Sequence, residues 1–311
     1  MFTSPIIHAQ SLTQPLYRTR TVEFVYPVAP GTAMDSFLRG AVDLVSGFLP
    51  KGAYFTNRPG ANSLIGTRHA LSYDGTPKVL VSSPTPIVIN PLLNSELGYH
   101  PFNDFFHEFL LIRQPMFLVC NPVVAKNFKE FIKIGQQPNK FLKASSTGIG
   151  SLLDLQSRLI EKHFNLNVIH APYSTNFILP VLSNEVDFTW VTANQTILSY
   201  IQTGRLIPIA TTGAQRKPLY PDVPALKEFI PGYESNVFFG FSIPQVSSNE
   251  KLTLKSAGVD WSFVHQNLVR KFSNQDFIFD TLKVALQYEK ILRDETKQWQ
   301  SILSKYALQP K

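Results

Sequence analysis

Two glycine-containing turns hold the residues of this sequence that are best placed to do chemistry. The first is Pro30-Gly31-Thr32, which stands between an apolar stretch and a helical pattern, and the second is segment 145–151, SSTGIGS. The first amide N–H groups of a helix have no partner within it and carry a partial positive charge, so such a turn binds carboxylates or phosphates without a lysine. Two such turns, one in each of two lobes, would hold one anion from both sides.

Each turn also has an ordinary structural explanation. Thr32 and Ser151 are typical helix N-cap residues, and glycine is a typical turn residue. Asp35 falls in the first turn of the first helix, where the helix dipole favours a carboxylate by about 0.3–1 kcal/mol. That carboxylate would alternatively accept hydrogen bonds from the loop or from an amine on a ligand. Taken singly, each turn, and Asp35 as well, favours the structural explanation over ligand binding.

Other kinds of site find little support in the sequence. Segment 145–151 lacks the G-x-G-x-x-G spacing of dinucleotide sites, and the chain has neither a G-x-x-x-x-G-K-[ST] phosphate loop nor a G-x-S-x-G nucleophile elbow. The seven histidines show no metal-ligand spacing. We therefore expect no cofactor and no metal site, and the sequence shows no catalytic centre.

The composition describes a globular protein with a weakly charged surface. The chain has 311 residues, 44% hydrophobic and 16% charged, which is enough for two domains. Its net charge of +7 suits an anionic ligand, but the basic residues are scattered, so we expect no nucleic-acid binding. No apolar run is long enough to predict a membrane span. The single cysteine, Cys120, lies in an apolar strand pattern and is interpreted as a buried structural residue.

The N-terminal residues, MFTSPIIHAQS, resemble the end of a secretory signal without its basic start or its full apolar middle. An ordinary tail explains them equally well. Residues 1–20 are therefore expected to be a signal remnant or a disordered tail.

Apolar runs alternate with helical patterns through most of the chain, which predicts an α/β architecture with mainly parallel sheets. The first unit is a strand at 21–27 followed by a helix at 33–49, which has apolar residues at helical spacing. The apolar stretch 108–122 is long for one strand and is a candidate crossover between lobes. Further strands are predicted at 78–83, just before 145–151, and at 166–173, 185–194 and 206–213, with an amphipathic helix at 288–308.

Ligands of open α/β sheets collect outside the carboxyl ends of the strands, where loops lead into helices. This rule selects five residues at predicted strand ends, namely Gly31, Ser83, Thr147, Tyr173 and Asn194. We treat these five as candidates for ligand contact.

The order of several segments resembles that of a known family. They run from about residue 21 to 244 and include VYPVAPGTAMDSFLRG, NRPGANSLIGTRHA, ASSTGIGSLLDLQSRL, HAPYSTNFILPVLSNEVDF and GYESNVFFGFSIP. Each motif is weak by itself. Together and in this order they resemble the periplasmic solute-binding receptors of tripartite tricarboxylate transporters, the Bug-type receptors.

The resemblance implies a two-lobed periplasmic-binding-protein fold, type II-like, in which two mainly parallel α/β lobes are joined by crossover strands around a ligand cleft. Lobe 1 is expected at 21–108 plus 238–311, lobe 2 at 109–237, and the hinge strands near 108–121 and 235–244. It further implies a periplasmic monomer without enzymatic activity, which captures a small mono-, di- or tricarboxylate and delivers it to a membrane permease.

The same resemblance implies the site residues. Pro30-Gly31 matches a loop whose amides hold one carboxylate, segment 146–151 matches the carboxylate-binding turn of the second lobe, and Tyr173 matches the tyrosine of a Pro-Tyr-x-Gly segment. The expected ligand-binding set is Ala29, Gly31, Thr32, Asp35, Ser83, Ser146, Thr147, Gly148, Ser151, Tyr173 and Asn194. Aromatic residues that would line the cleft or pack in the core are Tyr26, Phe117, Trp190, Phe238 and Phe239.

The sequence departs from the family pattern at several places. Thr32 replaces the second glycine of the first loop, which adds a hydroxyl and restricts positive φ, and Thr175 replaces the glycine of Pro-Tyr-x-Gly. Val191 stands where many members have an aspartate that would pair with an ammonium group, which argues against an amino-acid ligand. NSLIG at 62–66 replaces a glycine-rich segment.

Two rival functions stay open from the sequence. One is a receptor of the same fold that reports its ligand to a membrane sensor kinase. The other is a cytoplasmic two-domain enzyme that acts on an anionic substrate in the same cleft. Processing of the natural protein near Ala9 would favour a receptor, and turnover by purified protein would favour the enzyme.

Overall fold

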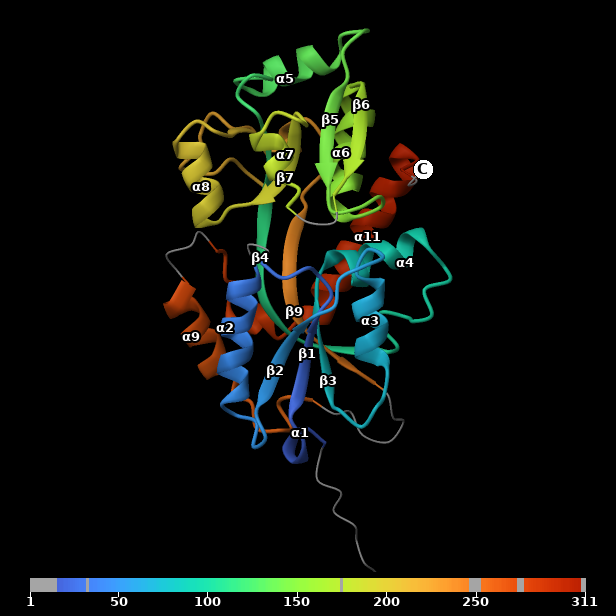
Figure 1. Ribbon diagram of the computed structural model, residues 1–311, viewed down its shortest axis with the longest axis vertical. Helices are drawn as coiled ribbons and strands as arrows, with labels where there is room; N and C mark the ends of the chain where they lie inside the picture. Colours follow the sequence, from blue (N-terminus) through green and yellow to red (C-terminus); the bar gives the residue numbers. More distant parts are fainter. Residues whose placement is uncertain (1–15, 32–33, 174–175, 246–252, 273–276, 309–311) are drawn as a thin grey trace, which may run out of the picture.

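The computed structural model describes residues 16–31, 34–173, 176–245, 253–272 and 277–308. Figure 1 shows an elongated molecule in two parts, one around β1, β2 and β3 and the other around β5, β6 and β7, with β4 and β9 running between them. Within these ranges, no helix combines the length and the apolar composition that a membrane span requires.

The first part is built on a strand that pairs in parallel with both of its neighbours, since β1 (Val22–Tyr26) lies between β2 (Ala53–Asn57) and β3 (Lys78–Ser82). Helix α2 (Asp35–Ser46) follows β1 and packs on β2 and on α9. The other elements here are α1 (Leu16–Thr19), α3 (Leu64–Leu71), the π-helix η1 (Thr85–Ile89), α4 (Asn90–Leu93), α9 (Trp261–Phe272) and α10 (Leu282–Ala285).

The second part repeats the parallel arrangement, because β5 (Leu142–Ser146) pairs in parallel with β6 (Val168–Pro172) and β7 (Phe188–Thr192). Helix α6 (Leu152–Phe164) follows β5 and packs on all three of these strands. The other elements here are α5 (Phe128–Gly135), α7 (Leu179–Leu182), α8 (Gln195–Gln202), β8 (Ile207–Thr211) and the short helix η2 (Leu226–Glu228).

One strand belongs to both sheets. Along β4 (Phe105–Cys120), the residues up to Pro115 pair antiparallel with β9 (Asn236–Pro244), and those from Met116 onward pair antiparallel with β7 and β8. Proline lacks the N–H that a ladder needs, so Pro115 is a suitable residue for the change of partner. The expected hinge strands at 108–121 and 235–244 correspond to β4 and β9, while the lobe boundaries at 108/109 and 237/238 stay predictions.

The mixed α/β architecture agrees with the sequence prediction, with one refinement in strand direction. The parallel pairs are those among β1, β2 and β3 and among β5, β6 and β7, whereas each antiparallel pair of the described strands involves β4 or β9. The helix predicted at 33–49 covers Asp35–Ser46, because the backbone turns after Gly47. Its predicted apolar face is buried, and Phe37 packs edge-on against Phe272.

The C-terminal helix joins the two parts. Helix α11 (Tyr288–Tyr306) packs on η1, on β4 and on α6. At its start the Tyr288 hydroxyl lies 2.9 Å from Ser82 Oγ of β3, and at its end the Tyr306 hydroxyl lies 2.9 Å from His163 Nδ1 of α6. If one part moves relative to the other, α11 must therefore bend or shift along its contacts with one of them.

Candidate functional site

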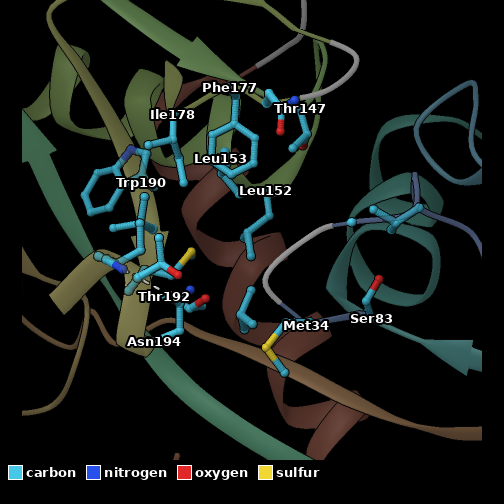
Figure 2. A pocket seen from close by; sticks show the side chains of 18 of the residues that line it. Met34, Ser83, Thr147, Leu152, Leu153, Phe177, Ile178, Trp190, Thr192 and Asn194 are labelled. Atoms are coloured by element: carbon cyan, nitrogen blue, oxygen red, sulfur yellow. Dashed lines mark hydrogen bonds between the residues drawn. The ribbon is translucent and has the colours of Figure 1, made fainter. Parts of the chain in front are cut away.

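A cavity of about 380 Å³ lies between the two parts of the molecule. Its lining comes from the loop after β1, the end of β3, the start of α6, segment 176–182, the end of β7 with the start of α8, and β9. In Figure 2 these elements surround a space into which Met34, Leu152 and Phe177 point. The carboxyl ends of β1, β3 and β7 meet here, as the rule for α/β sheets predicts.

Four of the predicted site residues line this cavity: Gly31, Ser83, Thr147 and Asn194. Gly31 has φ +77°, and an added Cβ would meet no atom within 4 Å, so this glycine is required by its backbone conformation and not by crowding. Thr32 and Thr175 lie outside the described residues. Ala29 is buried beside the first loop but is not part of the lining.

Asp35 begins α2 and turns away from the cavity lining. Its Oδ1 accepts from Asn57 Nδ2 at 3.0 Å and its Oδ2 accepts from Arg39 Nε at 3.0 Å. Burial opposes ionisation, but these two bonds and one from the Gly31 amide outweigh it and lower the pKa of Asp35. Of the two roles considered for this carboxylate, its contacts fit the one that holds the first loop in place.

The second turn is held by its own polar groups. Ser146 Oγ lies 3.3 Å from the Gly148 amide, and Ser151 Oγ accepts from Asp154 N at 3.4 Å, which makes Ser151 the predicted N-cap of α6. Gly148 and Gly150 have φ of +145° and +75°, which glycine adopts at little cost. Ser146, Gly148 and Ser151 are outside the cavity lining, so Thr147 alone of this predicted group reaches it.

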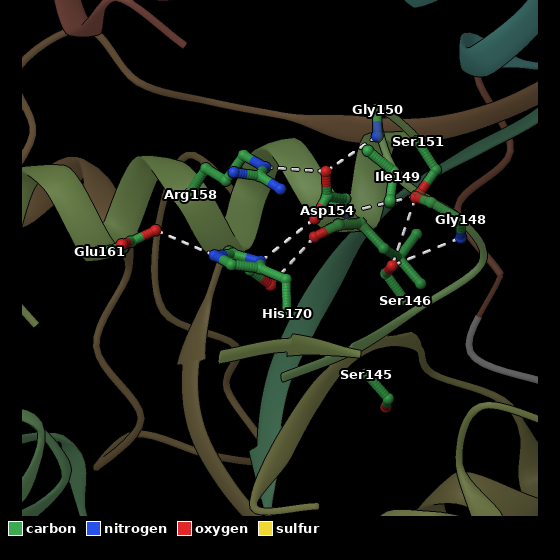
Figure 3. Close-up of polar contacts among 12 residues, drawn as sticks. Ser145, Ser146, Gly148, Ile149, Gly150, Ser151, Asp154, Arg158, Glu161 and His170 are labelled. Atoms are coloured by element: carbon green, nitrogen blue, oxygen red, sulfur yellow. Dashed lines mark hydrogen bonds and ion pairs between the residues drawn. The ribbon is translucent and has the colours of Figure 1, made fainter. Parts of the chain in front are cut away.

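A charged network under this turn was not foreseen from the sequence (Figure 3). Asp154 Oδ2 accepts from Gly150 N at 2.8 Å and from Arg158 Nε at 2.9 Å. His170 pairs through Nδ1 with Asp154 at 3.1 Å and through Nε2 with Glu161 at 2.9 Å. The S-x-x-D spacing from Ser151 is the signal that points to this arrangement.

The network determines which of its groups carry charge. Burial alone would lower the pKa of His170, but the carboxylates on its two ring nitrogens outweigh burial and raise it. Burial would raise the pKa of Asp154, but hydrogen bonds from His170 and Arg158 lower it. The ionised Asp154, 1% exposed, therefore fixes the Gly150 amide and with it the shape of the second turn.

Tyr173 is not brought to the cavity. Its amide donates to Ser146 O at 2.8 Å and its hydroxyl donates to Glu185 Oε1 at 2.9 Å, and Tyr173 is absent from the lining. Asn194, by contrast, lines the cavity and caps α8, since its Oδ1 accepts from Ile197 N at 3.0 Å. The strand-end rule therefore selected both Tyr173 and Asn194. The two residues differ in side-chain direction, since Asn194 lines the cavity and Tyr173 does not.

The lining is largely apolar. Of the aromatic residues considered, Tyr26, Trp190 and Phe239 line the cavity, and Trp190 donates its Nε1 to Ser157 Oγ at 3.0 Å. Phe117 and Phe238 are buried in the core instead. Val191, at the position where the resemblance implies an aspartate in many family members, lines the cavity, and so does Thr192.

One contact joins the two parts across the mouth of the second turn. Asn62, between β2 and α3, donates its Nδ2 to Ile149 O at 2.5 Å, and its own carbonyl accepts from Asn90 Nδ2 at 2.8 Å. Ala61, Asn62 and Ser63 all have positive φ. The departure NSLIG in the sequence therefore corresponds to a left-handed turn that reaches the other lobe.

A metal site and a reactive thiol are the remaining candidate chemistries. Across the described ranges, no three His, Cys, Asp or Glu side chains gather in a way that would hold a metal ion. Cys120 is fully buried, and burial raises the pKa of its thiol to about 12. Its interpretation as a buried structural residue is confirmed.

Comparison with known proteins gives a family for this geometry. A family model described as "Tripartite tricarboxylate transporter family receptor" matches residues 38–308. The chain belongs to this family. Protein BugT of Bordetella pertussis is 21% identical to this receptor over 294 residues, covering 92% of this chain and 89% of BugT.

Solved structures agree with the fold of this family receptor. The structure of an R. palustris protein with adipate has a TM-score of 0.78 at 18% identity, covering 95% of this chain and 100% of that one. MatC from Rhodopseudomonas palustris with bound malate has a TM-score of 0.77 at 18% identity, covering 91% of this chain and 99% of MatC. These similarities support the two-lobed fold, and the family is one of solute-binding receptors.

Proposed function

We propose that this protein is a periplasmic solute receptor, a monomer without enzymatic activity, that captures a small carboxylate between its lobes and delivers it to a tripartite tricarboxylate transporter permease. The observation that carries the proposal is the interlobe cavity, which Gly31 before α2 and Thr147 before α6 line from opposite lobes. Helix starts offer amide donors and a partial positive charge, and closure removes the water that would compete for them. The family, and the adipate and malate in the structures of two neighbours, support the same ligand class.

The first experiment measures unfolding of the full chain against a panel of mono-, di- and tricarboxylates. A ligand at a hundred times its Kd adds about 2.7 kcal/mol to the free energy of unfolding, which is a clear rise in Tm. Small-angle scattering with the same ligands reports closure. If no carboxylate raises Tm and none changes the scattering, the proposal is wrong.

A pair of glycine variants separates binding from folding. Gly31 and Gly232 have φ of +77° and +78°, and a Cβ added at either would meet no atom within 4 Å. Gly31→Leu and Gly232→Leu should therefore lose similar stability, about 1–2 kcal/mol each, from left-handed backbone strain. Only Gly31→Leu should weaken carboxylate binding, because Gly31 lines the cavity and Gly232 does not. Equal binding by the two variants would contradict the assignment of the first loop.

Delivery to a permease needs its own measurement. Uptake of the bound carboxylate by vesicles containing the permease should depend on this receptor and should fail with Gly31→Leu. Uptake that is independent of the receptor would leave binding intact but remove the transport role.

A further inference from the structure

Asn194 is a buried polar side chain at the far end of the cavity from the two glycine turns. It lines the cavity, is 9% exposed, and in Figure 2 lies on the opposite side of the space from Thr147 and Ser83. Its backbone stands between β7 and α8, whose first residue is Gln195. The far end of the cavity is therefore also the start of a helix.

The cap of α8 fixes which part of the Asn194 amide is available to a ligand. Asn194 Oδ1 lies 3.0 Å from Ile197 N, and because a backbone N–H can only donate, the capping atom must be the oxygen. The Nδ2 group is the other half of the side chain, and no described residue accepts a hydrogen bond from it. Asn194 therefore brings a hydrogen-bond donor to this end of the cavity.

The groups next to Asn194 either donate or adapt to their partner. The amides of Gln195 and Thr196 belong to the first turn of α8 and have no acceptor within the helix, whereas the Ile197 amide is taken by the cap. The hydroxyls of Thr192 and Thr196, which also line the cavity, can donate or accept. The groups of fixed polarity in this set are donors, and the helix start adds partial positive charge. An oxygen acceptor is favoured there over an ammonium group.

We propose that Asn194 sets the specificity of the receptor at the far end, where its Nδ2 donates to a carboxylate or carbonyl oxygen of a ligand whose first carboxylate lies at the glycine turns. This inference rests on the proposed function, since it names a specificity-determining residue and the second polar group of the ligand for the same cavity. A ligand amine would meet donors there, and both sides would lose water without gaining a hydrogen bond.

Two series of compounds test the preference on the full chain. Hexanoate, adipate and 6-aminohexanoate share a six-carbon chain, and 4-methylbenzoate, terephthalate and 4-(aminomethyl)benzoate share a ring; each series ends in a methyl, a carboxylate or an ammonium group. Calorimetry measures the dissociation constants. In each series that binds, we expect the dicarboxylate to bind at least about ten times more tightly than the ammonium compound, and more tightly than the methyl compound. A methyl or ammonium compound that equals or exceeds its dicarboxylate would overturn the inference.

Asn194→Asp tests the residue itself. Aspartate caps a helix as well as asparagine does, so the variant keeps the capping oxygen and replaces the Nδ2 donor with a charged acceptor. The preference should move toward the ammonium compound by at least about tenfold. Asn127→Asp is the matched control, because Asn127 caps α5 in the same way, with Oδ1 2.9 Å from Glu130 N, and lies outside the cavity lining. Equal preferences in the two variants would show that Asn194 does not set the specificity.

The possible failures are distinguishable. If compounds bind only from the wider mono-, di- and tricarboxylate panel, the tightest of them is measured with Asn194→Ser, since serine caps a helix but lacks the amide donor. Its affinity should fall by about tenfold or more relative to Asn127→Ser, the loss expected for a hydrogen bond to a charged group. Unchanged affinity would make the inference wrong and leave the receptor function standing. If no carboxylate of the panel or of either series binds, both are wrong.

Discussion

The bond from Asn62 to Ile149 offers a direct test of whether an interlobe contact sets ligand affinity. Asn62 Nδ2 donates to Ile149 O, 87 residues away, in the turn that Thr147 shares. The change we choose is Asn62→Gly, because residue 62 has φ +50° and glycine adopts this conformation without strain. The variant therefore loses the bond across the cleft and adds no backbone strain.

The size of the effect follows from the bond. A hydrogen bond contributes about 0.5–1.5 kcal/mol net, which changes the ratio of closed to open receptor by about two- to twelvefold. Binding requires the closed arrangement, so the apparent affinity falls by the same factor when closure is the minor state of the free protein. We expect the dissociation constant of the tightest carboxylate to rise by two- to twelvefold.

Calorimetry of the variant measures this change, and a second glycine variant controls for the backbone. Asn184 has φ +60° just after α7, and its backbone amide donates to Val181 O of that helix. Asn184→Gly should leave affinity unchanged. Small-angle scattering of Asn62→Gly at saturating ligand should still report closure. Unchanged affinity in Asn62→Gly would refute the idea that this bond stabilises the closed receptor.

Three further outcomes follow from the structure. An alanine at Gly148 would place its Cβ against Asn62 Oδ1, so Gly148→Ala should cost less affinity in the Asn62→Gly background than alone, which a double-mutant cycle by calorimetry checks. Cys120 should resist thiol reagents until the protein unfolds, as mass spectrometry of labelled protein would show, because burial raises the pKa of its thiol to about 12. Because folding raises the pKa of His170, the protonated side chain stabilises the fold, and this contribution is fully present below the unfolded-state pKa near 6.5. The contribution is lost as the pH rises through the folded-state pKa. Urea unfolding should therefore show a larger deficit for His170→Gln at about pH 5.5 than at about pH 8.5, and an equal deficit would contradict the charged network.

Several features of the site were predictable from patterns along the chain. The Ser151 side chain caps α6, and the Ser151 backbone carbonyl accepts the helical hydrogen bond from the Leu155 amide. The S-x-x-D spacing of Ser151 and Asp154 was visible in the sequence. The burial of Cys120 followed from the apolar strand around it. The strand-end rule also brought Gly31, Ser83, Thr147 and Asn194 to one cavity, because parallel strands meet at their carboxyl ends.

Side-chain direction was not predictable in the same way. Asp35 was a candidate for contact with a ligand, yet Asn57, on a strand that the sequence did not predict, turns it into the loop. Tyr173 lies at a strand end as Asn194 does, but the Tyr173 hydroxyl donates to Glu185 and does not line the cavity. Both outcomes depend on a partner that becomes a neighbour only when the chain folds.

The sequence by itself determined the α/β alternation, the two glycine turns before helices and the capping of the second, because periodicity and helix ends are local properties of the chain. The tertiary structure alone decided which residues of these turns line the cavity, that no described lining residue is charged, and that Asn62 meets Ile149 across it. Those facts depend on contacts between segments tens of residues apart, which arise when β4 and β9 bring the two sheets together.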